Sequence, residues 1–217
     1  MAEHADTQAL LRLVTWLSPA FPVGSFSYSG GLEQAIHQGL VTSADDLRLW
    51  CETLLERGNT WNDALLLSES YRAYGDAQRL IAVSELAEAL AGSRERHMET
   101  MLLGEAFLAA AGHWPHPSLA VLGTKAAYPV SVGAVAGAHR TGLKPALAAF
   151  LNATVSNAVS VAIRCGGVGV LARVEDTIGA VVARAAAASL EDLGGATFIA
   201  EIASLKHENL HSRLFRS

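Results

Sequence analysis

The sequence predicts an all-α fold, and three of its features support that class. Alanine is abundant and β-branched residues rarely alternate with polar ones, which favours helices over strands. Apolar residues recur at helical spacing along most of the chain. Hydrophobic residues make up 51% of the 217 positions, enough for a sizeable core. We therefore expect a single domain over 1–217, a helical bundle of about ten helices around a central buried helix at about 145–164.

The first half of the chain divides into one broken segment and several regular helices. Residues 7–17 show helical spacing, and a loop is predicted at 18–31, because two prolines and three glycines there exclude a regular helix. Ser43 and Asp76 stand where helix N-terminal caps are expected. The helices predicted after the loop cover about 32–39, 43–58, 60–74, 76–90 and 94–112.

The second half begins with a loop at 113–117 and is otherwise predicted to be helical. Pro129 and Pro145 fall in first turns, where the missing N–H of proline costs no hydrogen bond. A turn is expected at 165–169, because this stretch contains three glycines. The predicted helices cover about 118–127, 130–141, 145–164, 175–190 and 196–209.

The helix at 145–164 is apolar enough to raise the question of a membrane span. Its polar residues Asn152, Ser156, Ser160 and Arg164 follow one another at four-residue intervals, so they form one stripe. Lipid would leave this stripe without hydrogen-bond partners, whereas a packed bundle accepts it. We expect the helix to be buried among other helices, and we predict no membrane partner.

Charge and cysteine content narrow the partner class and the compartment. The net charge of −5 argues against nucleic acid as a partner, because phosphate-binding surfaces carry a basic excess. Cys51 and Cys165 lie in apolar helical surroundings and are predicted to be buried thiols of a cytosolic protein. The first residues show no basic region before an apolar stretch, so no secretory signal is expected. The predicted localisation is cytoplasmic.

One short string has the pattern of a zinc hydrolase. His207, Glu208 and His211 match H-E-x-x-H, which on a helix lets two histidines bind zinc while the glutamate activates water. No possible ligand follows His211, so a third one would have to come from upstream. A zinc-dependent hydrolase using these three residues is kept as the alternative, and a chance match on a polar helix face is the simpler interpretation.

The other motifs indicate no chemistry. The glycine clusters match neither phosphate-loop nor dinucleotide patterns, and no nucleophile elbow is present. His113 and His116 lie in a proline-bounded loop without a nearby cysteine or carboxylate, as solvated loop histidines do. We therefore predict that the chain is not an enzyme, with no catalytic residue, no cofactor and no metal site.

The loop at 18–31 is unusually rich in aromatic rings for a broken segment. Phe21, Phe26 and Tyr28 lie within it. Rings on a structured loop either pack inward or serve as anchors for a partner, and the sequence favours neither.

The C-terminal tail changes pattern after Leu205. Phe198, Ile202 and Leu205 are predicted to form a core-facing stripe. Beyond them, apolar residues stand among basic ones, with Leu210 and Leu214 four residues apart as in helices that bind grooves. A frayed end is typically small and polar, so we predict that the tail docks a partner.

Four segments resemble the UreF family of urease accessory proteins: SPAFPVGSFSYSGGLE (18–33), AGSRERHMETMLLGEAFL (91–108), FLNATVSNAVSVAIRCGGVG (150–169) and IASLKHENLHSRLFRS (202–217). The likeness covers essentially the whole chain from Leu10 onward. It implies an all-α homodimer in the cytosol without catalytic activity. It also implies a role in urease maturation, in which the protein bridges UreD (UreH in some systems) and the GTPase UreG so that nickel enters the urease apoprotein.

The resemblance further implies that the loop at 18–31 and the tail at 206–217 are docking segments. Two departures are visible: Ser25 follows Gly24 where many relatives carry a glycine pair, and 166–176 differ from the family pattern. A helical scaffold with unrelated partners also stays open. The positions implied to bind partners are Pro22, Gly24, Tyr28, Gly30, Glu33, Lys206, His207, Glu208, Ser212, Arg213, Leu214, Phe215 and Arg216.

Overall fold

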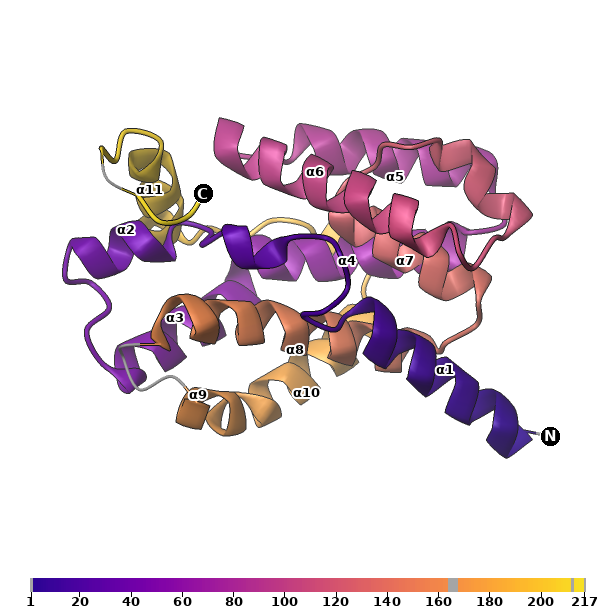
Figure 1. Ribbon diagram of the computed structural model, residues 1–217, viewed down its shortest axis with the longest axis horizontal. Coiled ribbons are helices and arrows are strands. Elements are labelled where there is room, and N and C mark those ends of the chain that lie inside the picture. Colours follow the sequence, from indigo (N-terminus) through magenta and orange to yellow (C-terminus); the bar gives the residue numbers. More distant parts are fainter. Residues whose placement is uncertain (1, 164–167, 212, 217) are drawn as a thin grey trace.

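The computed structural model describes residues 2–163, 168–211 and 213–216, and within these ranges its regular structure is helical without strands (Figure 1). The predicted all-α class is therefore confirmed. Short 3-10 helices occur at η1 (Ser25–Ser27), η2 (Pro117–Leu122) and η4 (Leu190–Asp192). The α-helices are α1 (Ala2–Trp16), α2 (Leu32–His37), α3 (Ala44–Arg57), α4 (Asn59–Ala73), α5 (Ala77–Ala89), α6 (Arg94–Ala111), α7 (Tyr128–Ala138), α8 (Leu143–Val161), α9 (Val168–Arg173), α10 (Glu175–Ala187) and α11 (Phe198–His207).

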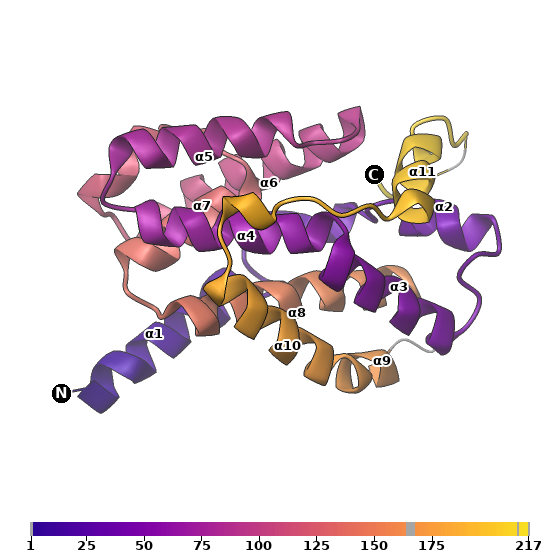
Figure 2. The ribbon, with the colours of Figure 1, turned by 180° about the vertical axis from the view of Figure 1, so that it is seen from behind.

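The centre of the fold is the pair α4 and α7. Helix α4 runs between α5, α6 and α7 on one side and α3, α8 and α10 on the other (Figures 1 and 2). Every residue from Pro129 to Ala138 in α7 is buried. The helix predicted to be central, about 145–164, corresponds to α8, which exposes Asn152 and Ser160. Ser156 of the predicted polar stripe is half-buried, and Arg164 lies outside the described residues. Helix α8 is therefore buried on one face only and covers the centre instead of forming it, which corrects the expectation that it is the buried central helix.

Glycines bring the two central helices together. A Cβ atom added at Gly133 would lie 2.3 Å from the carbonyl oxygen of Leu67, and one at Gly137 would lie 2.4 Å from that of Tyr71. These distances are too short for any side chain, so α4 and α7 are in backbone contact along this seam. The low side-chain volume of α7 therefore permits its complete burial.

Predicted caps and first-turn prolines are present at the helix starts. Ser43 and Asp46 form a reciprocal capping box at α3, and the Asp76 side chain accepts a hydrogen bond from the Arg79 N–H at α5. Pro129 lies in the first turn of α7, and Pro145 lies in that of α8. The capping residues and prolines therefore predicted the starts of these four helices correctly.

Three predicted segments differ from the structure. The stretch expected as a helix at 118–127 is the 3-10 helix η2, which ends before Gly123 at φ 58°. Helix α9 begins inside the predicted turn at 165–169, of which 165–167 lie outside the described residues. Helix α11 ends at His207 and not near residue 209. Each difference lies at a boundary, where tertiary packing overrides local propensity.

Helix α11 lies at the end of the molecule opposite α1. It packs on α2 and on the start of α6, and the chain end returns towards α2 (Figures 1 and 2). The two segments predicted to dock partners, far apart in sequence, therefore lie side by side.

Among the described helices, none is both long and apolar enough to cross a bilayer.

Candidate docking site formed by the two terminal segments

Backbone hydrogen bonds join the C-terminal tail to the N-terminal loop and α2. The Arg216 N–H donates to the carbonyl oxygen of Ser27 at 2.7 Å. The N–H groups of Leu214 and Phe215 donate to the carboxylate of Glu33 at 2.7 and 3.2 Å. Glu33 belongs to the first turn of α2, so one acidic side chain holds the tail against the loop.

The N-terminal loop divides its aromatic rings between the core and solvent. Phe21 and Tyr28 are buried, whereas Phe26 is 71% exposed. The side-chain amide of Asn157 in α8 donates to the carbonyl oxygen of Tyr28 at 3.0 Å. Gly24 has φ 75°, a conformation that favours glycine. The loop is thus fixed by two inward rings and presents the third.

Glycine also sets the distance between α2 and α11. Gly31 has φ 83°, and a Cβ atom added there would lie 2.7 Å from the backbone nitrogen of Ser204 in α11. Only glycine satisfies both the conformation and the contact. Gly31 was not among the predicted site residues, although its neighbour Gly30 was.

His207 is the most buried of the predicted site residues. Its side chain is fully enclosed between α2 and α6. Its Nδ1 lies 2.8 Å from a carboxylate oxygen of Glu95, and its Nε2 lies 2.9 Å from one of Glu33. Both ring nitrogens of His207 are therefore within hydrogen-bond distance of a carboxylate, one from each neighbouring helix.

Arg213 completes this carboxylate–histidine cluster, which consists of Glu33, Glu95, His207 and Arg213, and a contact with Glu208 lies beside it. The Arg213 guanidinium donates to Glu95 at 2.5 Å. The backbone N–H of Glu95 donates to the Glu208 carboxylate at 3.3 Å. Glu95 is buried and was not predicted, because nothing in its local sequence distinguishes it from a solvated helix residue.

The environment of Glu33 favours its ionised form. Burial would raise the pKa of this carboxyl, but the hydrogen bond from His207 and those from the two tail amides lower it below the usual value. Arg213 from the tail pairs with Glu95, so the second carboxylate of the cluster has a cationic partner.

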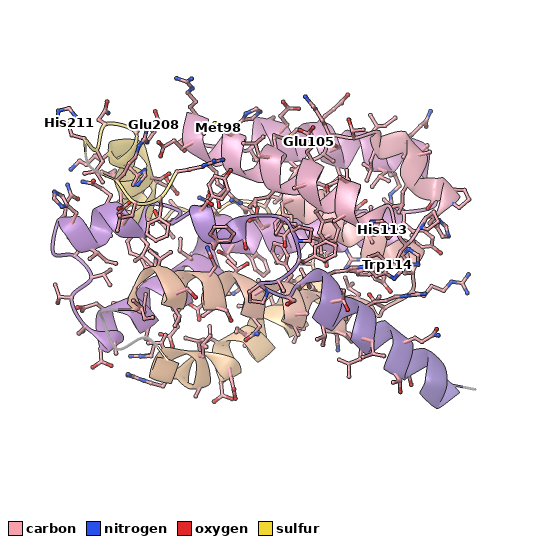
Figure 3. All side chains as sticks on the ribbon, in the orientation of Figure 1. Met98, Glu105, His113, Trp114, Glu208 and His211 are labelled. Carbon is pink, nitrogen blue, oxygen red and sulfur yellow. The ribbon has the colours of Figure 1, made fainter. Side chains whose placement is uncertain are left out.

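The zinc-site alternative is not supported by this geometry. Helix α11 ends at His207, so His207 and His211 do not share a helix face. Both ring nitrogens of His207 are in contact with carboxylates of Glu95 and Glu33, so neither faces His211. Within the described residues, no three potential metal ligands are grouped. Figure 3 shows His211 and Glu208 at one end of the molecule and His113 at the other.

The stripe on α11 faces solvent, which corrects the prediction that it faces the core. Phe198 is 72% exposed, Ile202 48% and Leu205 50%. The face buried against α2 and α6 is instead formed by Ala200, Ala203 and His207. Small residues on the inner face allow the close approach at Gly31, so the large apolar residues of α11 are left outside.

The exposed apolar residues of the two segments form one candidate docking site, which we call the terminal surface. All six side chains are exposed, whereas residues of the same types such as Leu32, Leu147 and Phe107 are buried in the core. Exposed apolar side chains are often found on protein-binding surfaces. The terminal surface comprises Phe26 from the loop, Phe198, Ile199, Ile202 and Leu205 from α11, and Leu214 from the tail.

The structure divides the predicted site residues into three groups. Those that hold the segments together are Glu33, His207, Glu208, Arg213, Leu214, Phe215 and Arg216. Those that shape or flank the loop and tail are Pro22, Gly24, Tyr28, Gly30 and Lys206, with Tyr28 buried and Pro22 and Lys206 exposed. Ser212 lies outside the described residues.

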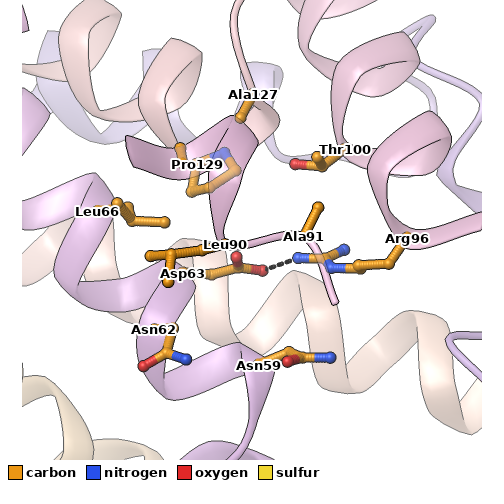
Figure 4. A pocket seen from close by; sticks show the side chains of 11 residues that line it. Asn59, Asn62, Asp63, Leu66, Leu90, Ala91, Arg96, Thr100, Ala127 and Pro129 are labelled. Carbon is orange, nitrogen blue, oxygen red and sulfur yellow. Dashed lines mark hydrogen bonds and ion pairs between the residues drawn. The ribbon is translucent and has the colours of Figure 1, made fainter. Parts of the chain in front are cut away.

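A second polar feature, at the α4–α6 contact, is too small to bind a ligand. Arg96 forms an ion pair with Asp63 beside a cavity of about 20 Å³ (Figure 4), which is room for about one water molecule. Burial would lower the pKa of Arg96, but Asp63 and Glu99 raise it above the usual range. This pair therefore joins two helices and offers no room for a ligand.

The described residues form an all-helical protein whose terminal segments lie side by side and carry the candidate docking site. The UreF family model matches residues 41–174. Relatives named urease accessory protein UreF, from Sinorhizobium medicae (strain WSM419) and Rhizobium meliloti (strain 1021), are 97% and 80% identical, each over the full length of both chains. Urease accessory protein UreF 1 of Brucella canis is 56% identical, over 97% of this chain and 95% of its own. The chain belongs to the UreF family.

Proposed function

We propose that this protein acts in urease maturation as a non-catalytic bridge between UreD (UreH) and the GTPase UreG. Its relatives carry the name urease accessory protein. In this proposal the terminal surface holds UreD, and the complex positions UreG so that nickel, the cargo, reaches the urease apoprotein. Action in the cytoplasm and as a homodimer is part of the same proposal, on the family resemblance.

The outward stripe on α11 is the observation that carries the proposal. Phe198, Ile202 and Leu205 recur on one exposed helix face. Burying each such side chain contributes about 1.5–3 kcal/mol, so a partner that covers the stripe gains enough to bind specifically. The same face would be an aggregation hazard if it had no partner.

Copurification tests the proposal directly. We expect the double variant Ile202→Glu/Leu205→Glu to lose capture of UreD, because charged side chains would have to be desolvated in the interface. Both residues are at least 48% exposed, so helical circular dichroism and the urea midpoint should stay close to those of the unchanged chain.

A matched control comes from α5. Ile81 is 43% exposed and lies outside the terminal surface, so Ile81→Glu should retain UreD capture. Equal capture of UreD by the α11 variant and the Ile81 variant would contradict the assigned surface.

The wider role needs a cellular test. Removing the protein from a urease-producing cell should lower urease activity, and added nickel should restore it only partly. Unchanged urease activity without the protein would instead favour a helical scaffold with unrelated partners.

A further inference from the structure

We propose that Glu33 is a positioning residue for partner binding. Its carboxylate holds the tail backbone at Leu214 and Phe215, and this presents the Leu214 side chain to the partner in a fixed position. Glu33 itself does not touch the partner. The proposal rests on the proposed function, because it identifies the residue that orders one part of the terminal surface before UreD binds.

The chain end has no regular structure that would order it from within. The described residues 213–216 contain neither helix nor strand, so no ladder of backbone hydrogen bonds fixes their torsion angles. Ordering such a segment costs conformational entropy. The amides of Leu214 and Phe215 donate instead to a side chain of α2. The conformation of the tail therefore depends on acceptors that other segments supply.

The position and the charge of Glu33 suit it to this role. One carboxylate oxygen accepts the Leu214 N–H at 2.7 Å, and the other accepts the Phe215 N–H at 3.2 Å. Two successive donors on one carboxylate fix the backbone between them, and an ionised acceptor binds more strongly than a neutral one. The Glu33 side chain is only 14% exposed, so water competes little for these oxygens.

The two bonds give the apolar side chains of the tail opposite environments. Phe215 is half-buried, whereas Leu214 is 89% exposed. The Arg216 N–H donates to the carbonyl oxygen of Ser27, and this places the tail beside the turn that presents Phe26. A partner thus meets Leu214 in an ordered position, so the cost of ordering the tail is not added to the cost of binding.

The other anchors of the tail do not fix Leu214 directly. Arg213 pairs with Glu95 of α6, and this pair holds a side chain while leaving the backbone torsion angles of Leu214 unconstrained. The Arg216 bond to the loop lies two residues further on. Glu33 is therefore the group that sets the position of Leu214 itself.

Amide hydrogen exchange of the full-length protein without a partner tests the positioning. In the unchanged chain, the Leu214 and Phe215 amides should be protected relative to a free peptide of residues 206–217. Glu33→Ala should lower this protection about tenfold or more, because hydrogen bonds to a charged acceptor are lost. Amides inside α7 should keep their protection. Equal exchange of the tail amides in the two proteins would overturn the proposal.

Glu33→Gln separates the hydrogen bonds from the packing of the side chain. A carboxamide has the shape of the carboxylate but only one acceptor oxygen. It should keep the shorter bond, to the Leu214 amide, and lose the bond to the Phe215 amide. Protection should then stay high at Leu214 and fall at Phe215. Equal loss at both amides, as large as that in Glu33→Ala, would contradict positioning by these bonds.

A double-mutant cycle on UreD affinity distinguishes positioning from direct contact. Glu33→Ala and Leu214→Ala should each raise the dissociation constant about tenfold. Because Glu33 acts through Leu214, the double variant should bind about as weakly as Leu214→Ala alone. Glu85→Ala, at an exposed position of α5, is the matched control and should leave the affinity unchanged. Multiplied effects in the double variant would show direct contact and overturn the proposal.

The two measurements also separate this proposal from the proposed function. Loss of tail protection in Glu33→Ala, with no UreD binding even by the unchanged chain, would contradict the proposed function and support the positioning of the tail. UreD binding of equal affinity by the unchanged chain and by Glu33→Ala would overturn the positioning role and leave the proposed function intact.

Discussion

At the residue scale, burial controls the chemistry of a single thiol. Cys51 on α3 is buried, as predicted, and burial with a smaller effect of Glu52 raises its pKa to about 12. The thiolate is the reactive form, so at pH 8 its fraction is about a thousandfold below that of an ordinary thiol with a pKa near 8.5.

This difference gives a reactivity prediction for Cys51. In a Cys165→Ser background, Cys51 should react with Ellman's reagent on the order of a thousandfold more slowly in the folded protein than in urea at pH 8. Comparable rates in both conditions would show that the thiol is accessible in the native state.

The glycine seam gives a prediction at two matched positions. Gly133→Ala should lower the free energy of unfolding by about 2 kcal/mol or more, because the new Cβ would lie 2.3 Å from the Leu67 carbonyl oxygen. A Cβ atom added at Gly179 in α10 would have no neighbouring atom within 4 Å. Gly179→Ala should therefore raise the free energy of unfolding by about 0.5–1 kcal/mol. Urea unfolding measures both, and equal effects would contradict the backbone contact.

Some contacts of single residues in the candidate site could not be predicted from the sequence. Glu33 and His207 were placed in the site by family resemblance, but the contact between them depends on three helices meeting. Glu95 and Gly31 take part in the same contact and carry no local pattern that distinguishes them. Long-range pairs of this kind follow from tertiary packing, which single-sequence patterns do not contain.

At the element scale, the start of α3 depends on an ionised side chain. The Asp46 carboxylate accepts hydrogen bonds from the backbone and hydroxyl groups of Thr42 and Ser43, and those bonds lower its pKa below the ordinary value, led by the Thr42 N–H. A lowered pKa means that the stabilising effect is complete above the ordinary value and is lost as the pH falls through the folded value.

Because the pKa of Asp46 is lowered in the folded protein, removing this side chain should matter less at low pH. Asp46→Ala should lower the melting temperature at pH 7, and the difference from the unchanged chain should narrow as the pH is taken from about 5 towards 2.5. Thermal unfolding followed by circular dichroism measures it. A difference that stays constant over this range would exclude the ionised cap as its cause.

Helical periodicity predicted the terminal helices but not their orientation. On α11 the stripe of large apolar residues faces solvent, and on α1 Leu10, Leu11 and Val14 are also exposed, while Leu13 and Trp16 are buried. Periodicity identifies an apolar face without saying whether the same chain covers it. The orientation of inner helices such as α4 and α7 is not ambiguous in this way, because other helices pack around them.

At the scale of the whole molecule, the fold class followed from the sequence, whereas its centre did not. Composition and spacing predicted helices of nearly the right extent, with caps at Ser43 and Asp76. The longest apolar helix was expected at the centre, but the low-volume helix α7 lies there, because backbone contact at Gly133 and Gly137 permits denser packing than large side chains do.

Assembly of two copies is the prediction that belongs to this scale. Light scattering on the purified protein should give twice the chain mass of 22.8 kDa at micromolar concentration. A mass of one chain that does not change with concentration would contradict the homodimer that the family resemblance implies.

The bond between the Glu33 carboxylate and the Leu214 amide, 181 positions apart in the sequence, has a consequence for biosynthesis. A ribosome makes the N-terminal loop early, but the surface that includes this loop is complete only after residues up to Arg216 have emerged. A nascent or prematurely terminated chain therefore lacks the contact that holds the tail to α2. On the proposed function, we expect a chain cut before Leu214 to lack this bond and to capture UreD less well than the full chain.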